Sequence, residues 1–403
     1  MNIYIYNCSN TFNYGSMMMG ENFISYFNKI SKTKNNFYVE TDNEINIKRL
    51  KKATDIDEIF PVKMGALFNE GITRYNYITI LAGLDGVKVL SNLARDIDLV
   101  VVLGGDDYTE DYGWKGPVLN AIKFNILKKA GLKVVMMGQT MGPYKSFRKP
   151  IMKKLLSNID RIYPRDAITL NYLKTLGLIN IEITDDLALL PLSKQQELDK
   201  SKKFITYCPS ELIYRYSKEG NREDWIDFNL FMIDKIMNKY PNKSLVLLAH
   251  VIKPEHVDDR LIANELYNLV KDKYSDRIII KSEEMYPFEV RDYIQQSLFT
   301  ISSRMHPVVS SIQCEIPAIA LSYSTKYWGI IGDRYGLGDY IIDIRYLKYD
   351  EMKGKFEKII EKIDQEYIEI QASMIEKNRM AKRRLVETME DINKLVETNN
   401  KIK

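Results

Sequence analysis

The chain has 403 residues, 45% of them hydrophobic and 28% charged, and a formal net charge of +4. This length suffices for two domains of ordinary size, each with its own core. The positive charge is too small to indicate nucleic-acid binding, and no apolar run reaches the roughly 18 residues of a membrane span. The start, MNIYIYNCSN, has strand character and lacks the regions of a signal peptide. We therefore expect a cytoplasmic protein, either free or associated with the inner face of the membrane.

Short apolar runs alternate with stretches of helical spacing in the first half of the chain, a pattern typical of a parallel sheet. The expected strands cover 2–7, 37–41, 99–105, 133–139, 161–165 and 181–184. The expected helices cover 17–30, 117–130, 147–158 and 167–176, with one more near 73–83 in a region that is otherwise unclear.

The polar segment LSKQQELDKSKK (192–203) predicts a domain boundary, and a second alternating series follows it. Its expected strands cover 204–210, 244–250, 277–282, 298–303, 318–323 and 340–344. Its expected helices cover 223–239, 257–273, 288–296, 307–314 and 325–332. Two highly charged helices, about 350–370 and 371–398, close the chain, and their interleaved Glu and Lys residues predict exposed faces.

These elements predict an α/β protein with two parallel sheets facing across a cleft. We place the domains at 1–195 and 196–347, followed by C-terminal helices at 348–403. Ligands of open parallel sheets bind outside the carboxyl ends of the strands. Candidate functional residues should therefore follow directly after predicted strands.

The strongest candidate of this kind is the segment ISSRMHP, which contains Arg304 and His306. Arg304 offers a planar fork for a carboxylate or a phosphate, and His306 can exchange a proton near neutral pH. A helix that begins near Pro307 adds backbone donors. The segment predicts an anion pocket with an acid/base residue at its edge, and a structural histidine is the alternative for His306. Lys326 adds a further cation after the next strand.

Other predicted strand ends carry polar residues and glycines. These residues could bind a ligand, or they could form ordinary turns, helix caps or solvated charged loops. The candidate ligand-binding residues in these joints are Asn13, Gly15, Gly104, Gly105, Gln139 and Thr140. The pattern G-x-G-x-x-G is absent, so the dinucleotide fingerprint is not met.

Arg165 also follows a predicted strand, directly before Asp166, the expected N-cap of the next helix. An ion pair with Asp166 or a neighbour is the alternative to a ligand role for Arg165. His250 ends a strand as well and is interpreted as structural, whereas His256 is interpreted as solvated. Cys8, Cys208 and Cys314 are far apart, which excludes a disulfide framework or a zinc cluster and predicts core residues.

Five motifs occur in order over most of the chain: NYGSMMMGENF, DLVVVLGGDDY, GQTMGP, YPRDAITLNYL with TDDLALL, and SRMHPVVSSIQCEIPAIALSYSTKYWGIIGD. Together they resemble the polysaccharide pyruvyl transferase family. The resemblance implies a GT-B-like fold of two Rossmann-like domains, with the acceptor on the N-terminal domain and the donor on the C-terminal one. It also implies phosphoenolpyruvate as donor substrate, with no cofactor and no metal.

The resemblance implies roles for individual residues as well. Arg304 and the backbone near Met305 resemble contacts to the phosphate or carboxylate of the donor, and His306 resembles the catalytic acid/base. Arg165 resembles a second donor-binding arginine, and Lys326 a lysine that supports the anion. The chain departs from the family at Ser16, where an Asp is frequent, and in Asp186-Leu187-Ala188, where Asp-Pro-Ala is common.

The function expected from this resemblance is transfer of a pyruvyl group from phosphoenolpyruvate to a sugar of a cell-envelope polysaccharide or its precursor, with formation of a ketal. The acceptor is a sugar or glycan, with a lipid-linked form as one option. Two alternatives remain: a GT-B glycosyltransferase that uses a nucleotide sugar, and a non-enzymatic binding protein on the same fold. The oligomeric state is left open.

Overall fold

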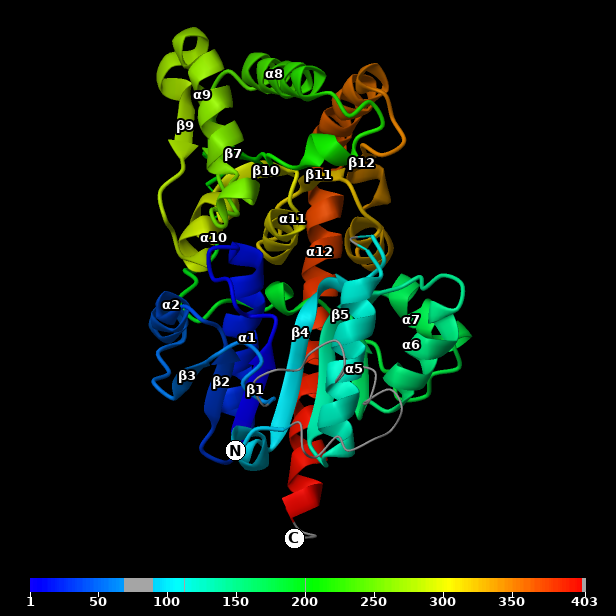
Figure 1. The fold of residues 1–403 in the computed structure, drawn as a ribbon. Coiled ribbons are helices and arrows are strands. Elements are labelled where there is room, and N and C mark those ends of the chain that lie inside the picture. The colour runs from blue at the N-terminus through cyan, green and yellow to red at the C-terminus, as the bar shows by residue number, and fades with distance from the viewer. Residues whose placement is uncertain (69–89, 112, 200, 401–403) are drawn as a thin grey trace. The chain divides into compact units, whose positions relative to one another are not determined.

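The computed structural model describes residues 1–68, 90–111, 113–199 and 201–400, which form two compact units (Figure 1). The N-terminal unit comprises Met1–Thr11, Met19–Leu187 and Arg383–Lys403. The C-terminal unit comprises Phe12–Met18 and Ala188–Lys382. The unit changes after residue 187, earlier than the boundary expected at 195. The segment 12–18 and the C-terminal helix are also assigned differently from the expected ranges.

The N-terminal unit contains one parallel six-stranded sheet in the order β3-β2-β1-β4-β5-β6. Its strands are β1 (Asn2–Tyr6), β2 (Asn36–Glu40), β3 (Ile59–Val62), β4 (Leu99–Tyr108), β5 (Lys133–Met141) and β6 (Arg161–Pro164). Its helices are α1 (Tyr14–Ile30), which begins in the other unit, α2 (Glu44–Thr54), α4 (Leu93–Asp96), α5 (Lys115–Lys129), α6 (Arg148–Ser157) and α7 (Ala167–Thr175). This strand order is that of a Rossmann fold, with its topological switch point between β1 and β4.

Both faces of this sheet are covered, as the apolar strands predict. Tyr4, Val100 and Val134 point to one face and pack in a common core with residues of α5, α6 and α7. Their chain neighbours Ile5 and Val101 are also fully buried. Two of the helices in the common core, α5 and α6, lie side by side.

The C-terminal unit repeats the same topology with the order β12-β11-β10-β7-β8-β9. Its strands are β7 (Phe204–Cys208), β8 (Ser244–Leu248), β9 (Ile278–Lys281), β10 (Ser297–Ser302), β11 (Ala318–Ser322) and β12 (Ile341–Asp343). Its main helices are α8 (Arg222–Lys239), α9 (Arg260–Tyr274), α10 (Pro287–Gln295), α11 (Met305–Gln313) and the π-helix η6 (Trp328–Arg334). Short 3₁₀ turns are η2 (Leu187–Leu189), at the change of unit, η3 (Ile213–Tyr216), η4 (Glu255–Val257), η5 (Ser275–Arg277) and η7 (Gly338–Tyr340). The switch point of this sheet lies between β7 and β10.

Residues 12–18 belong to the C-terminal unit because their backbone bonds to it. The amide of Ile252 donates to the carbonyl of Phe12 at 3.0 Å, and the amide of Tyr14 donates to the carbonyl of His250 at 3.3 Å. The hydroxyl of Tyr14 accepts from the amide of Met285 at 3.0 Å. The first turn of α1 is thereby attached to the end of β8.

The chain closes with α12 (Tyr349–Asn400), one long helix with a kink at Glu366 in place of the two expected helices. It is not exposed on all sides, because residues at helical spacing are buried along one face. These include Met352, Phe356, Ile363, Leu385, Met389 and Ile392. The interleaved charges that suggested exposure occupy the remaining faces.

Most expected strands and helices are confirmed, and the three cysteines are buried and unpaired. The strand expected at 181–184 is wrong, because the segment contains one isolated bridge, from Ile181 to Ile162, although the amides of Glu182 and Thr184 also donate to carbonyls of β6. The helix expected at 325–332 is the π-helix at 328–334. The strand β3 and the helix α2 were not foreseen, and the helix expected near 73–83 lies outside the described residues. Among the residues described, no helix is long and apolar enough to cross a bilayer.

Gly104 provides a test of how closely β4 and β5 approach. A Cβ at this position would lie 2.2 Å from the carbonyl oxygen of Gly138, a backbone atom that cannot rotate away. We expect Gly104→Ala to lower the free energy of unfolding by about 2 kcal/mol or more. Chemical denaturation measures the change.

Gly354 is the matched control, because a Cβ there meets no atom within 4 Å. This residue lies inside α12, where alanine is favoured over glycine by about 1 kcal/mol. Gly354→Ala should therefore raise stability. Equal effects of the two substitutions would contradict the packing described for Gly104.

Candidate active site

Arg304 occupies the joint between β10 and α11 in the C-terminal unit. Its backbone is extended, with φ −109° and ψ 144°, and Ser302 holds it from both sides. The Ser302 hydroxyl accepts from the amide of Arg304 at 2.9 Å and donates to its carbonyl at 2.7 Å. The amide of Ser303 donates to the carbonyl of Cys208, at the end of β7, at 3.0 Å. Arg304 therefore lies at the switch point, the place where open parallel sheets bind their ligands.

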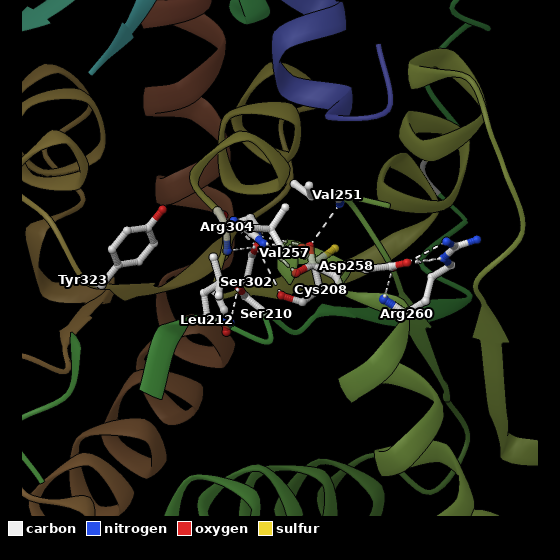
Figure 2. Close-up of polar contacts among 12 residues, drawn as sticks. Cys208, Ser210, Leu212, Val251, Val257, Asp258, Arg260, Ser302, Arg304 and Tyr323 are labelled. Carbon is white, nitrogen blue, oxygen red and sulfur yellow. Dashed lines mark hydrogen bonds and ion pairs between the residues drawn. The ribbon is translucent and has the colours of Figure 1, made fainter. Parts of the chain in front are cut away.

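The side chain of Arg304 forms a buried ion pair with Asp259. Its Nη2 donates to Asp259 Oδ1 at 2.7 Å and to the carbonyl of Val257 at 3.0 Å, and its Nε donates to Asp259 Oδ2 at 3.1 Å. Figure 2 shows Arg304 beside Val257. The Arg304 side chain is 14% exposed and that of Asp259 is fully buried. Within the described residues, none of these bonds uses Nη1. A ligand role for Arg304 stays a prediction, and Nη1 is the atom that such a role would use.

Burial and charge act in opposite directions on this pair. Burial raises the pKa of Asp259, while the charge and hydrogen bonds of Arg304 oppose that rise. Burial by itself lowers the pKa of the Arg304 guanidinium, but the Asp259 carboxylate outweighs it, and the net direction is upward. The guanidinium therefore stays charged although its side chain is largely buried.

His306 lies in the first turn of α11 and packs directly on Gly15, in the first turn of α1. A Cβ on Gly15 would lie 2.1 Å from Nδ1 of His306 and 2.3 Å from its Cγ. Only glycine allows this approach. The N-terminal ends of two helices thus meet at the imidazole, and their dipoles favour an anion there.

His250 lies next to this group and is buried. Its ring is 5.6 Å from that of Tyr14 in an edge-on arrangement. Burial lowers the pKa of His250 well below its usual value, and the positive charges of His306 and Arg304 lower it further. His250 is therefore neutral at physiological pH.

Lys326 follows β11 in the same unit and is half-buried. Its Nζ lies 3.4 Å from the hydroxyl of Tyr323 and 5.2 Å from the centre of that ring. The adjacent Tyr327 donates its hydroxyl to the carbonyl of Ser303 at 3.1 Å. The segment that carries Lys326 is thereby fastened to the backbone beside Arg304.

Arg165 lies in the N-terminal unit, after β6, and is only 1% exposed. Its Nη1 pairs with Asp186 at 2.8 Å, and its Nε donates to the Thr140 hydroxyl at 2.9 Å. That hydroxyl donates to Asp166 at 3.0 Å, and Asp166 caps α7 as expected by accepting from the amide of Thr169. The structure thus confirms the ion pair that was the alternative for Arg165, and its partner is Asp186.

Gly104, Gly105 and Gln139 lie at the carboxyl ends of β4 and β5 in the N-terminal unit. Gln139 is fully buried and donates to the carbonyls of Val102 and Leu103 at 3.0 and 2.7 Å. Gly104 is required by the approach of Gly138. These contacts account for the residue types by packing, and a ligand role for them stays a prediction. Within residues 1–68, 90–111, 113–199 and 201–400, no group of three or more metal-ligating side chains is present.

The C-terminal unit therefore brings together Asn13, Gly15, Arg304, Met305, His306 and Lys326 from the set expected. Arg165, Gly104, Gly105, Gln139 and Thr140 belong to the N-terminal unit. Sequence reasoning missed Asp259 and Tyr14. No signal pointed to Asp259, since Asp258-Asp259 before α9 is an ordinary start of a helix.

The two sheets of identical strand order define a GT-B-like fold. UDP-GlcNAc 2-epimerase from Neisseria meningitidis, bound to UDP-GlcNAc, is similar with 12% identity and a TM-score of 0.57, covering 99% of both chains. The pneumococcal O-GlcNAc transferase GtfA in complex with UDP and GlcNAc is similar with 11% identity and a TM-score of 0.55, again over 99% of both chains. At such identities the likeness shows the fold alone.

The family follows from a more specific match. The model of the polysaccharide pyruvyl transferase family matches residues 13–325, and the chain belongs to this family. The match begins at Asn13 and ends one residue before Lys326. The amylovoran biosynthesis protein AmsJ of Erwinia amylovora is 21% identical over 305 residues, which are 71% of each chain. Together these findings support an enzyme of pyruvyl transfer in polysaccharide biosynthesis.

The lowered pKa of His250 predicts a loss of stability in acid. His250 is neutral in the folded protein but becomes protonated in the unfolded chain as the pH falls below its usual value of 6.5. The unfolded chain then binds more protons, so the free energy of unfolding should fall by about 1 kcal/mol between pH 7.5 and 5.5 from this group. Urea denaturation of His250→Gln at the two pH values should lack this part of the decrease.

His256→Gln is the control, because His256 lies exposed in η4. Its decrease in stability between the two pH values should match that of the unmodified protein. A decrease that is unchanged in His250→Gln would show that His250 is not held neutral by the fold.

Proposed function

We propose that the protein transfers a pyruvyl group from phosphoenolpyruvate to two hydroxyls of one sugar in a polysaccharide or its precursor, forming a cyclic ketal. Membership of the family supports pyruvyl transfer. The observation that carries the donor assignment is the packing of His306 on Gly15 where two helix N-termini meet, with Arg304 and Lys326 on the same unit. A cationic site with one proton-exchanging ring suits an anion that must be protonated during the reaction.

Phosphoenolpyruvate carries a phosphate and a carboxylate close together. Nη1 of Arg304 and the backbone amides at the start of α11 would hold one of these groups. Lys326 would add charge to the same anion. Asp259 would not touch the donor but would fix the plane of the Arg304 guanidinium.

The reaction needs one proton delivered and others removed. Imidazolium His306 would give a proton to the methylene carbon, which becomes the methyl group and leaves the adjacent carbon electrophilic. A sugar hydroxyl adds to that carbon, phosphate departs with its bridging oxygen, and a second hydroxyl of the same sugar closes the ketal. Neutral His306 would take the proton of an attacking hydroxyl, and the cations would stabilise the departing phosphate.

The acceptor remains the less specified half of the proposal. We assign it to the N-terminal unit, which ends at Leu187, a residue that departs from the family pattern. A lipid-linked sugar precursor fits this assignment. The buried Arg165 would serve the site indirectly, by holding Thr140 and Asp186 in place.

A glycosyltransferase that uses a nucleotide sugar is the rival function. The observation that favours it is the fold, which the chain shares with proteins solved with UDP or UDP-GlcNAc. A non-enzymatic binding protein would bind neither donor. Calorimetric titration of the full chain with phosphoenolpyruvate and with UDP separates these functions: only the first ligand should bind.

Arg304→Lys tests the donor site while keeping a positive charge beside Asp259. An alanine would leave that buried carboxylate unpaired and destabilise the fold by about 3–5 kcal/mol. The lysine cannot bond Asp259 and the donor at once, so we expect the Kd for phosphoenolpyruvate to rise at least about tenfold. Calorimetry measures the change.

Arg260→Lys is the matched control, because Arg260 also pairs with an aspartate, Asp258 at 2.6 Å, but is 38% exposed. It should bind phosphoenolpyruvate as the unmodified protein does. An unchanged Kd in Arg304→Lys would remove Arg304 from the donor site.

His306→Gln tests the acid/base assignment. Glutamine keeps a polar side chain of similar reach but cannot exchange a proton near neutral pH. Turnover, measured as phosphate release in the presence of acceptor, should fall by about 10²–10⁴-fold, while the Kd for phosphoenolpyruvate changes little. Full turnover in this variant would exclude His306 from proton transfer.

A further inference from the structure

One stretch of the chain is far more positively charged than the chain as a whole. The whole chain has 58 Lys and Arg residues against 54 Asp and Glu residues. Residues 112–159 contain ten Lys and Arg residues and no Asp or Glu. This stretch supplies α5, β5 and α6 of the N-terminal unit, so the excess charge is carried by two adjacent helices and their connections.

Few of these ten cations are neutralised within the protein. Lys128 and Lys133 pair with Asp160, and Arg148 pairs with Glu110. The other seven have no acidic partner within 4 Å in the part of the chain that the structure describes: Lys115, Lys123, Lys129, Lys145, Lys149, Lys153 and Lys154. Six of the seven are exposed, while Lys123 is partly buried and interacts electrostatically with Glu40, and Lys145 interacts in the same way with Glu110.

Between α5 and α6 lies an apolar groove with a volume of about 270 Å³. Isoleucine and leucine side chains from both helices line it, together with Lys129 and Lys154. The two amides in the lining are satisfied internally: Asn158 donates to Asn125 at 2.7 Å, and Asn125 donates to the carbonyl of Leu155 at 2.7 Å. The open part of the groove therefore offers apolar surface flanked by two ammonium groups.

Two large aromatic side chains stand exposed at the starts of the same helices. Trp114 precedes α5 and is 42% exposed, and Phe147 precedes α6 and is 63% exposed. Their rings are 6.4 Å apart, and the Arg148 guanidinium lies 5.5 and 5.6 Å from the two ring centres. On the same helices, Leu119 and Ile151 are also exposed. We call this surface, made by the groove, the aromatic pair and the surrounding lysines, the α5–α6 face.

We propose that the α5–α6 face docks on a bilayer that contains anionic phospholipid. The exposed lysines without an ion-pair partner in the described residues match negatively charged headgroups. The aromatic pair and the apolar groove match the boundary between headgroups and acyl chains, where tryptophan and phenylalanine are favoured beside basic residues. A nucleic acid would account for the lysines but leave the apolar groove unexplained. The inference does not depend on the proposed transfer reaction, whose donor site lies in the other unit.

Sedimentation of the full-length protein with vesicles tests the proposal. The probes are vesicles of phosphatidylcholine alone and vesicles of phosphatidylcholine mixed with phosphatidylglycerol. We expect binding to the mixed vesicles only, weakened by added salt because the attraction is electrostatic. Equal binding to both kinds of vesicle, or none to either, would overturn the proposal.

Two double variants locate the surface. Lys129→Glu/Lys154→Glu should lower binding to the mixed vesicles by about tenfold or more, and Trp114→Ala/Phe147→Ala should lower it as well. The matched control is Lys32→Glu/Lys48→Glu, which makes the same change of charge at exposed lysines of the same unit. A loss of binding in the control equal to that in Lys129→Glu/Lys154→Glu would show an effect of net charge alone and refute the assignment to this face.

Two further measurements distinguish the outcome from misfolding and from other occupants. The temperature of thermal unfolding should be unchanged in all three variants, and because this measurement needs no donor, a failure of the donor proposal would leave the test intact. Light scattering after size-exclusion chromatography reports on a second copy of the chain. A dimer that the two α5–α6 variants dissociate would assign the face to self-association and overturn the membrane proposal.

Discussion

The buried ion pair of Arg304 and Asp259 is the contact on which the candidate site depends. Asp259 also accepts from the amide of Val251 at 3.0 Å, and Val251 forms an isolated bridge with Asn13. One carboxylate thus connects the end of β8, the joint after β10 and the segment before α1. Buried ion pairs contribute little net stability. The benefit here is orientation, because the guanidinium plane is fixed before any ligand arrives.

Each unit contains a buried arginine–aspartate ion pair after a strand, but the two arginines differ in their exposure. In both, an arginine follows a strand and pairs with an aspartate from a distant segment. Arg165 is closed off on every side, whereas Arg304 keeps 14% of its side chain exposed. That difference decides which arginine can meet an anion directly. The shared topology therefore does not imply two equivalent anion sites, and the chemistry is expected where the guanidinium remains accessible.

Sequence patterns anticipated those parts of the molecule that follow from local rules. Apolar runs located nearly all strands, and an aspartate directly before a predicted helix identified Asp166 as its N-cap. The pairing of Arg304 with Asp259 was not predictable, because 45 residues separate them and either aspartate before α9 suits a helix start. The prediction that α12 is exposed was wrong for another reason. Its many charged residues are interleaved with apolar residues at helical spacing, and these apolar residues are buried along one face. The requirement for Gly15 appears only once His306 is placed against it.

The division of the chain between the units has a consequence for synthesis on the ribosome. The C-terminal unit contains residues 12–18, and the N-terminal unit contains the last part of α12, from Arg383 onward. Domains commonly fold one after another as they emerge. Here the first unit lacks the part of α12 from Arg383 onward until the whole second unit has been synthesised, with buried positions such as Leu385 and Met389 still to be filled. A nascent chain that has reached the second sheet must therefore carry an unfinished first core, and this core is completed only when the segment from Arg383 onward packs against it.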